Sequence, residues 1–439
     1  MAAIIAVALR GPRLSSHGCE HDRVPEKPMD LILRRARLPD HTPGAPPVDI
    51  GVQDGRIVAI APDLAAEAPE HDADGRLVCG GFVETHIHLD KACIIDRCAP
   101  EPSREAPEPA ARVAAVKHSF TEADTAARAA RTLEKCIGHG TTRMRTHVEV
   151  DPPVGLAGYA AVKAVAAAYA WAIDVEICVF PQEGLTGRPE TEAALIAALR
   201  DGARVIGAAP DYDHDHEGQL RSVFALAHEF DADVDLHLDF GNSPSHMDIG
   251  TVCDLTEQHR LGGRVAVGHV TKLAALPPEE LATWGRRLAD VGVAVTVLPS
   301  TDLFLMGRDR RWNVPRSVVD AHGLADLGVT CSLSTNNVLN PFTPFGDGSL
   351  LRMANLQANI LQVSGAARLR ECFEMLTGRS ARLLNLRDYG VAMGNPADLV
   401  VLDAVTPAQA VAEIAAPLAV FKRGRRTVTR RPVELHRPH

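Results

Sequence analysis

From residue 121 onward, apolar runs alternate with Ala- and Leu-rich stretches that have helical periodicity. A helix should begin at Thr121, because Thr121-Glu122-Ala123-Asp124 is similar to a capping box, and it should end near Gly138 or Gly140. Short apolar runs rich in β-formers then predict strands at residues 142–150, 175–180, 204–208, 233–238, 265–270, 293–298 and 329–333.

An eighth apolar run precedes these, starting near Leu77 and ending in Thr85-His86-Ile87-His88. Near-continuous apolar strands separated by helices are typical of a parallel sheet that is buried on both faces. Eight such repeats favour an α/β fold of the closed (β/α)8 TIM-barrel type, with a doubly wound open sheet as the alternative.

Both ends of the chain predict β-structure instead. Residues 31–38 indicate a strand, and residues 48–60 indicate a hairpin that turns at Asp54-Gly55. Residues 394–402, 418–422 and 426–428 are again β-rich. We therefore expect a small β-sandwich subdomain built from both termini, from segments 29–78 and 390–430, beside a barrel over residues 79–389.

Residues 1–28 combine a short apolar run with a polar segment. A signal peptide would carry positive charge before its apolar run, and this chain has none there. We interpret residues 1–28 as a disordered N-terminal extension.

Composition excludes several classes of protein. The net charge of the 439-residue chain is −10, and no basic run is interleaved with aromatic residues, which argues against nucleic acid as a partner. No apolar stretch is long enough to span a membrane. Nine cysteines without a regular spacing fit free buried thiols in a reducing cytoplasm. The sequence is compatible with a homo-oligomer.

His86 and His88 end the first barrel strand two residues apart. Side chains at i and i+2 of a strand point to the same side, so both imidazoles should aim at one place. Converging neutral imidazoles suit zinc or iron. Two surface histidines at a strand end remain the alternative.

Polar residues recur at the carboxyl ends of the other strands, where barrels of this type place their active sites. His237 and His269 lie inside apolar strands, where an unpaired imidazole would be costly. His147, Gln182 and Asp239 have ordinary alternatives as rim or solvated residues. The candidates at the strand ends are His86, His88, His147, Gln182, His237, Asp239, His269 and Asn336.

The chain resembles the amidohydrolase superfamily, in the branch of cytosine deaminase and N-isopropylammelide amidohydrolase. The resemblance extends from Met29 to about Asp403. It is carried by the motifs FVETHIHLDK at 82–91, RTHV at 145–148, FPQEG at 180–184, DLH at 235–237, GH at 268–269, NLRDYG at 385–390 and GNPADL at 394–399.

This resemblance implies one divalent transition metal, zinc or iron, held by His86, His88 and His237. His269 would polarise the attacking hydroxide, and Gln182 would contact the polar edge of a small-molecule substrate. We therefore expect hydrolysis of a C–N bond in a small cyclic amidine, amide or amino-substituted heterocycle.

Two positions depart from the pattern of the family. Phe240 stands where the family has an acidic residue, and Asn336 stands where it has an aspartate that acts as general base. An amide cannot take a proton from water, so that proton would pass to Asp239, Glu183 or His269.

An apolar side chain at Phe240 disfavours cytosine itself as the substrate. We expect His147, Phe240 and Phe342 to line the substrate pocket. The alternative function is that of a catalytically impaired relative that binds a small molecule or a partner.

Overall fold

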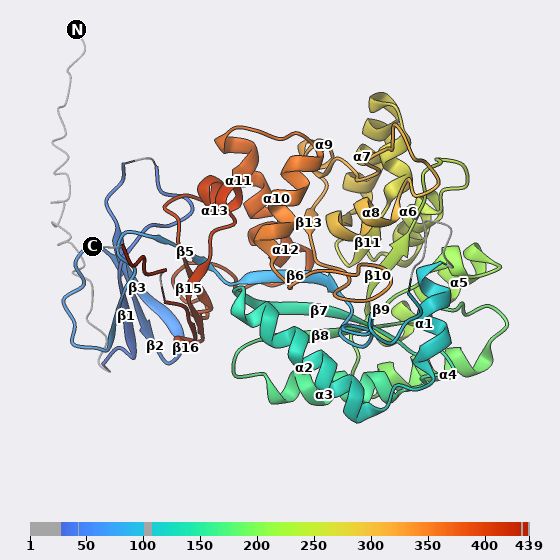
Figure 1. Cartoon of the computed structure of the whole chain (residues 1–439), viewed down its shortest axis with the longest axis horizontal. Coiled ribbons are helices and arrows are strands. Elements are labelled where there is room, and N and C mark those ends of the chain that lie inside the picture. Colours follow the sequence, from blue (N-terminus) through green and yellow to red (C-terminus); the bar gives the residue numbers. More distant parts are fainter. Residues whose placement is uncertain (1–27, 43, 101–107, 432, 438–439) are drawn as a thin grey trace, which may run out of the picture.

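The structure is a computed structural model that describes residues 28–42, 44–100, 108–431 and 433–437. A large α/β unit lies beside a smaller β unit that contains both ends of the described chain (Figure 1). The expected disordered extension at residues 1–28 lies, except for Pro28, outside the described residues.

The large unit is a barrel of eight parallel strands that follow one another in sequence order. They are β6 (Phe82–Ile87), β7 (Thr141–Glu149), β8 (Asp174–Phe180), β9 (Val205–Ile206), β10 (Asp233–Leu238), β11 (Val265–His269), β12 (Val293–Val297) and β13 (Cys331–Leu333).

The barrel closes between its first and last strands. The His88 N–H donates to the Asn336 carbonyl, and the Asn336 N–H donates to the His86 carbonyl, both at 2.9 Å. The predicted TIM barrel is therefore confirmed, and the open sheet is excluded. The same two hydrogen bonds fix Asn336 beside the His86–His88 pair.

Helices cover the outside of the barrel, and their apolar faces share one large core with the strands (Figure 1). Thr121 caps α2 as expected, accepting the Asp124 N–H at 3.2 Å. The helices are α1 (Pro109–Lys117), α2 (Glu122–Gly138), α3 (Ala157–Ala168), α4 (Pro189–Arg200), α5 (His216–Phe230), α6 (Ile249–His259), α7 (Pro278–Val291), α8 (Pro299–Leu305), α9 (Ala321–Asp326), α10 (Leu350–Ile360), α11 (Ala366–Glu374), α12 (Gly378–Leu383) and α13 (Pro407–Glu413).

The smaller unit is a sandwich of two four-stranded sheets, ordered β3-β2-β1-β4 and β16-β15-β14-β5. Leu33 and Ile50 from the first sheet share a core with Leu399 and Phe421 from the second. This confirms a β-sandwich built from both termini. Its strands are β1 (Leu31–Ala36), β2 (Val48–Gln53), β3 (Arg56–Ala61), β4 (Glu70–Asp72), β5 (Leu77–Gly80), β14 (Leu399–Leu402), β15 (Pro417–Lys422) and β16 (Arg425–Thr429).

The apolar run that starts at Leu77 is not one strand, contrary to the expectation from sequence. It forms β5 of the sandwich and β6 of the barrel, and Gly81 separates the two. A Cβ atom on Gly81 would lie 2.1 Å from Oγ1 of Thr142, so only glycine lets the chain cross between the units here. Hydrophobicity alone could not reveal this break.

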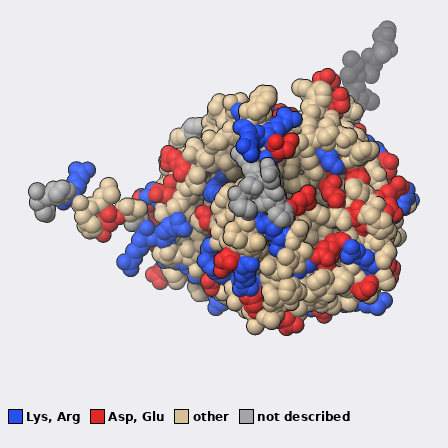
Figure 2. Space-filling view, turned by 45° about the vertical axis from the view of Figure 1, so that its right-hand side comes forward, with Lys and Arg blue, Asp and Glu red and all other residues tan. Residues whose placement is uncertain are grey.

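The surface carries both signs of charge. Lys and Arg side chains are interspersed with Asp and Glu over the face shown in Figure 2. The eight cysteines of the described chain are buried and unbridged. Among the described residues, no helix combines the length and the apolar character needed to cross a membrane.

Candidate active site

Three imidazoles converge at the carboxyl end of the barrel. Nε2 of His237 lies 3.1 Å from Nε2 of His86 and 3.0 Å from Nε2 of His88. Each neutral imidazole carries a single N–H, so three ring nitrogens at these distances cannot all be paired in hydrogen bonds with one another. A shared cation would bind all three lone pairs.

The electrostatics of these rings also suit a metal. Burial, helped by the neighbouring His147, lowers the pKa of His86 to about 3. Burial likewise holds the pKa of His88 and of His237 well below the usual range for histidine. Neutral nitrogen ligands are the form that binds zinc or iron, so the residues present fit such an ion.

A buried carboxylate stands behind the imidazoles. Asp235 lies two residues before His237 on β10 and accepts a hydrogen bond from Nη1 of Arg145 at 2.9 Å. Its other oxygen lies 3.7 Å from Nδ1 of His86 and 3.3 Å from Nε2 of His147. Carboxylates in this position orient metal-binding histidines, because they fix which ring nitrogen carries the proton.

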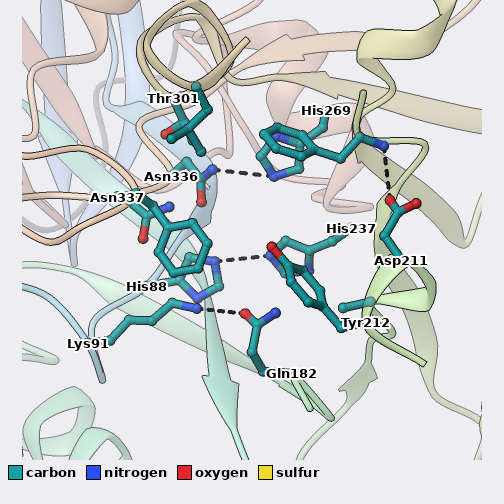
Figure 3. A pocket seen from close by; sticks show the side chains of 14 residues that line it. His88, Lys91, Gln182, Asp211, Tyr212, His237, His269, Thr301, Asn336 and Asn337 are labelled. Atoms are coloured by element: carbon teal, nitrogen blue, oxygen red, sulfur yellow. Dashed lines mark hydrogen bonds between the residues drawn. The ribbon is translucent and has the colours of Figure 1, made fainter. Parts of the chain in front are cut away.

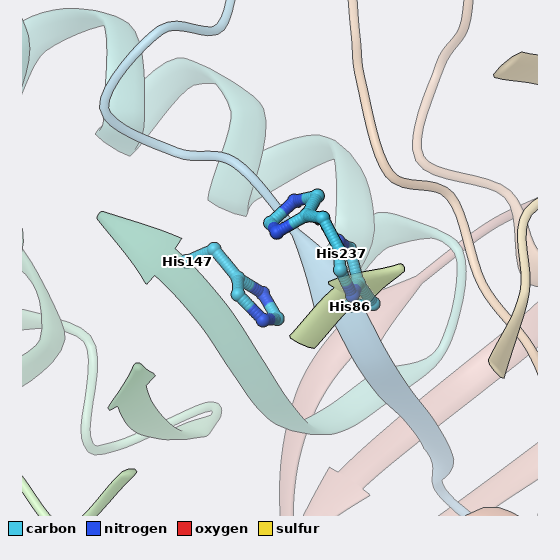
Figure 4. Close-up of side chains that lie close together, drawn as sticks. All are labelled: His86, His147 and His237. Carbon is cyan, nitrogen blue, oxygen red and sulfur yellow. Dashed lines mark hydrogen bonds between the residues drawn. The ribbon is translucent and has the colours of Figure 1, made fainter. Parts of the chain in front are cut away.

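His147 does not lie where we expected it. Its ring lies beside His86 (Figure 4) and stacks on the His86 ring with centroids 3.8 Å apart. His147 is not among the residues that line the cavity. His86, His147 and His237 also offer nitrogens that lie within 4.8 Å of one another. We favour His88 over His147 as the third ligand, because His88 faces the cavity and His147 faces Asp235.

His269 completes the group from β11. Its Nδ1 lies 2.6 Å from Oδ1 of Asp302 on α8, and its Nε2 lies 3.4 Å from Nδ2 of Asn336. Asp302 is fully buried, and burial raises the pKa of its carboxyl group. With Nδ1–H donated to Asp302, the Nε2 lone pair of His269 is directed into the cavity.

Asp239 lies outside the cavity wall. Its carboxylate accepts the N–H groups of Asp248 at 2.8 Å and Ile249 at 3.1 Å, at the start of α6. Burial raises the pKa of Asp239 to about 6. The left-handed backbone at this residue, with φ 51°, turns the side chain from the barrel mouth towards the helix. Its placement indicates a helix-capping role and gives no support to proton transfer.

The imidazoles open into a cavity of about 430 Å³, which includes the space at its mouth (Figure 3). Gln182, Phe240 and Phe342 line it, as expected from sequence. The Phe240 ring meets His269 edge-on, with centroids 4.9 Å apart. The full lining is His88, Lys91, Gln182, Ala209, Asp211, Tyr212, His237, Phe240, His269, Thr301, Leu305, Asn336, Asn337 and Phe342.

Lys91 is the cation of this cavity. Its Nζ donates to Oε1 of Glu149 at 2.7 Å and to Oε1 of Gln182 at 2.9 Å, and it lies 4.8 Å from the centre of the Phe342 ring. Since the Gln182 oxygen is bound to Lys91, the amide presents its Nε2 donors to a ligand. This side of the cavity therefore offers hydrogen-bond donors.

The network behind Lys91 is buried and charged. Nζ of Lys117 lies 3.1 Å from Oε2 of Glu149, 3.2 Å from Oδ2 of Asp151 and 2.5 Å from Oε1 of Glu183. Burial opposes ionisation of Glu149, but Lys91 and Lys117 hold its pKa at about 2. The anionic Glu149 therefore anchors Lys91 at the cavity.

Sequence reasoning missed several of these residues. Lys91 follows the His-x-His motif by three positions, and Asp235 precedes His237 on the same strand face, so both carried a signal. Asp302 and Asp211 lie in segments without a recognisable motif, and only the fold brings them to the site.

The chain is similar to known proteins over most of its length. A family model described as "Amidohydrolase family" matches residues 159–428, more than half of the chain. N-isopropylammelide isopropyl amidohydrolase from Pseudomonas sp. (strain ADP) is 28% identical over 408 residues, which cover 91% of this chain and 97% of that protein. Pterin deaminase from Rhizobium rhizogenes is 27% identical, over 81% of this chain and 82% of that protein.

A solved structure is also similar over nearly the whole chain. The crystal structure of 5-methylcytosine deaminase from Klebsiella pneumoniae, liganded with 5-fluorocytosine, superposes with a TM-score of 0.85 at 28% identity. The match covers 93% of this chain and 99% of that one.

Proposed function

The chain belongs to the amidohydrolase family, and from this premise we propose that it hydrolyses a C–N bond in a small cyclic amidine, amide or amino-substituted heterocycle other than cytosine. The observation that carries the proposal is the convergence of the Nε2 atoms of His86, His88 and His237 beside a cavity that His88 and His237 help to line. The relatives named N-isopropylammelide isopropyl amidohydrolase and pterin deaminase support the same class of substrate.

We assign one divalent zinc or iron ion to His86, His88 and His237. Such an ion, when bound with an open position, acts as a Lewis acid and lowers the pKa of water towards neutrality. Gly268 makes room for this arrangement, because a Cβ atom there would lie 3.1 Å from Cε1 of His86.

His269 is the group that moves the proton in this proposal. Asp302 accepts Nδ1–H at 2.6 Å, so Nε2 is left to take a proton from the attacking water and to return it to the leaving nitrogen. Asn336 cannot do this work, because its amide has no basic lone pair. Its Nδ2 lies 3.4 Å from Nε2 of His269, and its Oδ1 is buried without a protein partner.

Lys91 and Gln182 bind the acceptor edge of the substrate. An ammonium and an amide donor suit carbonyl oxygens or an ionised imide, and the charge on Lys91 strengthens these hydrogen bonds. Phe240, Leu305 and Phe342 supply apolar walls around a flat ring. The apolar Phe240 is the reason why we do not propose cytosine itself.

A second candidate is a catalytically impaired relative that binds a small molecule or a partner. Asn336 is the specific observation in its favour, because the amide stands where the family has its base. The two candidates make opposite predictions for turnover.

The deciding experiment measures ammonia or amine release from a panel of pyrimidines, triazines and cyclic imides, using protein supplied with zinc or iron. The hydrolase should turn over at least one of them, and His86→Ala should lose both the activity and the bound metal. Retention of metal by the His86→Ala variant would contradict the ligand assignment. Binding of panel compounds without release of amine would favour the impaired relative.

Asn336→Asp separates the two candidates further. A carboxylate oxygen binds a divalent cation more strongly than an amide oxygen, so the affinity for metal should rise. If His269 already supplies a competent base, the rate should stay flat or fall. A large gain in rate would show that the native site lacks its base.

A further inference from the structure

The cavity wall contains a carboxylate that neither binds the metal nor moves the proton in the proposed function. Asp211 follows the short strand β9 in the 3-10 turn at Pro210–Tyr212, and it is the one acidic residue among the described residues that line the cavity. Its side chain is about 25% exposed. A carboxylate in the wall of a ligand-sized cavity is a strong acceptor for any donor that the ligand presents.

Two contacts hold this carboxylate in place. Oδ2 of Asp211 accepts the Phe240 N–H at 3.0 Å, and Oδ1 lies 3.3 Å from Nζ of Lys272. Lys272 is itself fixed by a hydrogen bond of 3.0 Å to the His246 carbonyl. A carboxylate has about four lone-pair directions, so these two contacts leave acceptor capacity for a ligand.

The cavity has two unlike walls as a result. Lys91 and Gln182 lie on one side, and Asp211 lies on the other, beyond His237 and Tyr212 (Figure 3). The first wall presents donors and the second presents an anionic acceptor. A ligand that satisfies both has acceptors on one edge and an N–H donor on another.

We propose that Asp211 is a specificity-determining residue that binds an N–H group of the substrate. The inference rests on the proposed function for the identity of the cavity, and it narrows the substrate to an oxo-heterocycle that keeps a ring or exocyclic N–H opposite its carbonyl edge. A ring whose nitrogens are all alkylated offers Asp211 no donor. Such a ring leaves the carboxylate desolvated and unpaired.

A purely structural role for Asp211 makes a different prediction. If the carboxylate only anchors the Phe240 backbone and Lys272, its loss should weaken every ligand by the same factor. Recognition of an N–H should instead weaken only those ligands that have one. N-alkylation of the ligand therefore separates the two roles.

The experiment is calorimetric titration of the zinc-supplied protein with uracil and cyanuric acid, and with their fully N-methylated counterparts, 1,3-dimethyluracil and 1,3,5-trimethyl isocyanurate. Asp211→Asn should weaken binding of the better N–H probe by about tenfold or more, the usual effect of losing a charged acceptor. It should leave the methylated probes within twofold. Asp174→Asn is the matched control, because Asp174 has a similarly exposed side chain, pairs with Lys422 at 2.7 Å at the start of β8 outside the cavity lining, and should leave every probe within twofold.

Equal weakening of the N–H and N-methyl probes by Asp211→Asn would overturn the proposal, and so would unchanged binding of all of them. Failure of the native protein to bind either N–H probe would overturn it as well. Selective loss of the N–H probe in a protein that releases no amine would sustain the role of Asp211 and refute the hydrolase. If the native protein releases amine and Asp211→Asn leaves its selectivity unchanged, the hydrolase is sustained and the role of Asp211 is refuted.

Discussion

Replacing Asp302 with asparagine should slow turnover by about 30- to 900-fold, without loss of metal. The magnitude follows from the 2.6 Å contact between Oδ1 of Asp302 and Nδ1 of His269. When His269 takes up a proton, that contact becomes an ion pair in a fully buried setting. A charge-assisted hydrogen bond contributes about 2 kcal/mol, and two unit charges 4 Å apart at an effective dielectric of 20 contribute about 4 kcal/mol.

These energies convert to the stated rate factors at about 1.4 kcal/mol for each tenfold change. The assay is steady-state amine release with the best substrate of the panel, together with metal analysis and thermal unfolding of each variant. The loss should appear in kcat, because Asp302 acts on the proton and does not touch the substrate.

Asp49→Asn provides a matched control. Asp49 is a buried carboxylate of the β-sandwich that accepts the Arg35 and Leu64 N–H groups and pairs with Arg34. Its replacement tests the general cost of removing a buried charge and should leave kcat unchanged. If Asp302→Asn kept kcat within threefold while retaining its fold and metal, His269 would not be the base and the proton pathway would be wrong.

Two further predictions concern the charged network behind Lys91. Lys117→Met should destabilise the protein by about 3–5 kcal/mol in urea denaturation, because it leaves buried carboxylates without their cation. Lys163→Met, which removes the exposed partner of Asp201, should leave the urea midpoint unchanged. Equal midpoints for the two variants would contradict this reasoning. Burial and, after it, the charge of Glu149 raise the pKa of Asp151 from 3.8 to about 6. The native state therefore binds the proton on the Asp151 carboxyl group more tightly than the unfolded state does. The resulting stabilisation is fully present below pH 3.8 and is lost as the pH rises through 6. Relative to Asp151→Asn, the native protein should therefore lose about 2.4 kcal/mol of unfolding free energy between pH 4 and pH 7. Parallel stability curves for the two proteins would refute the shift.

The barrel was predictable from sequence because its signal is repeated. Most of the strands coincide with a short run rich in β-formers that a helical stretch follows, and eight such repeats leave few architectures open. The sequence predicts a boundary between the sandwich and the barrel after residue 78, but the exact break at Gly81 was not predictable, because the apolar run that starts at Leu77 continues across it. Only the close approach of Thr142 explains why the chain turns there.

The site residues likewise include some that were predictable from the sequence and some that were not. The carboxyl ends of the strands identified Gln182, Phe240 and the imidazoles, because side-chain alternation along a strand fixes which way these residues point. His147 misled us for a specific reason. It lies near the end of β7, as the sequence predicts, but its ring stacks on the His86 ring and does not line the cavity. Lateral position within the barrel is a tertiary property that no local pattern encodes.

The resemblance to the family led us to expect carboxylates at positions 240 and 336, and two carboxylates that the sequence did not single out, Asp302 and Asp211, lie near these positions. Phe240 and Asn336 lack a charge, but Asp302 contacts the far side of His269, and Asp211 accepts a hydrogen bond from the Phe240 backbone. The strand ends converge at the mouth of a barrel, so a carboxylate that follows one strand can contact a side chain that another strand carries. An impaired protein has no need to keep the Asp302 carboxyl group buried against His269, because burying a polar group is costly unless it is paired. The cost of this buried pair therefore favours a working base over a vestigial site, and the Asp302→Asn experiment tests that argument directly.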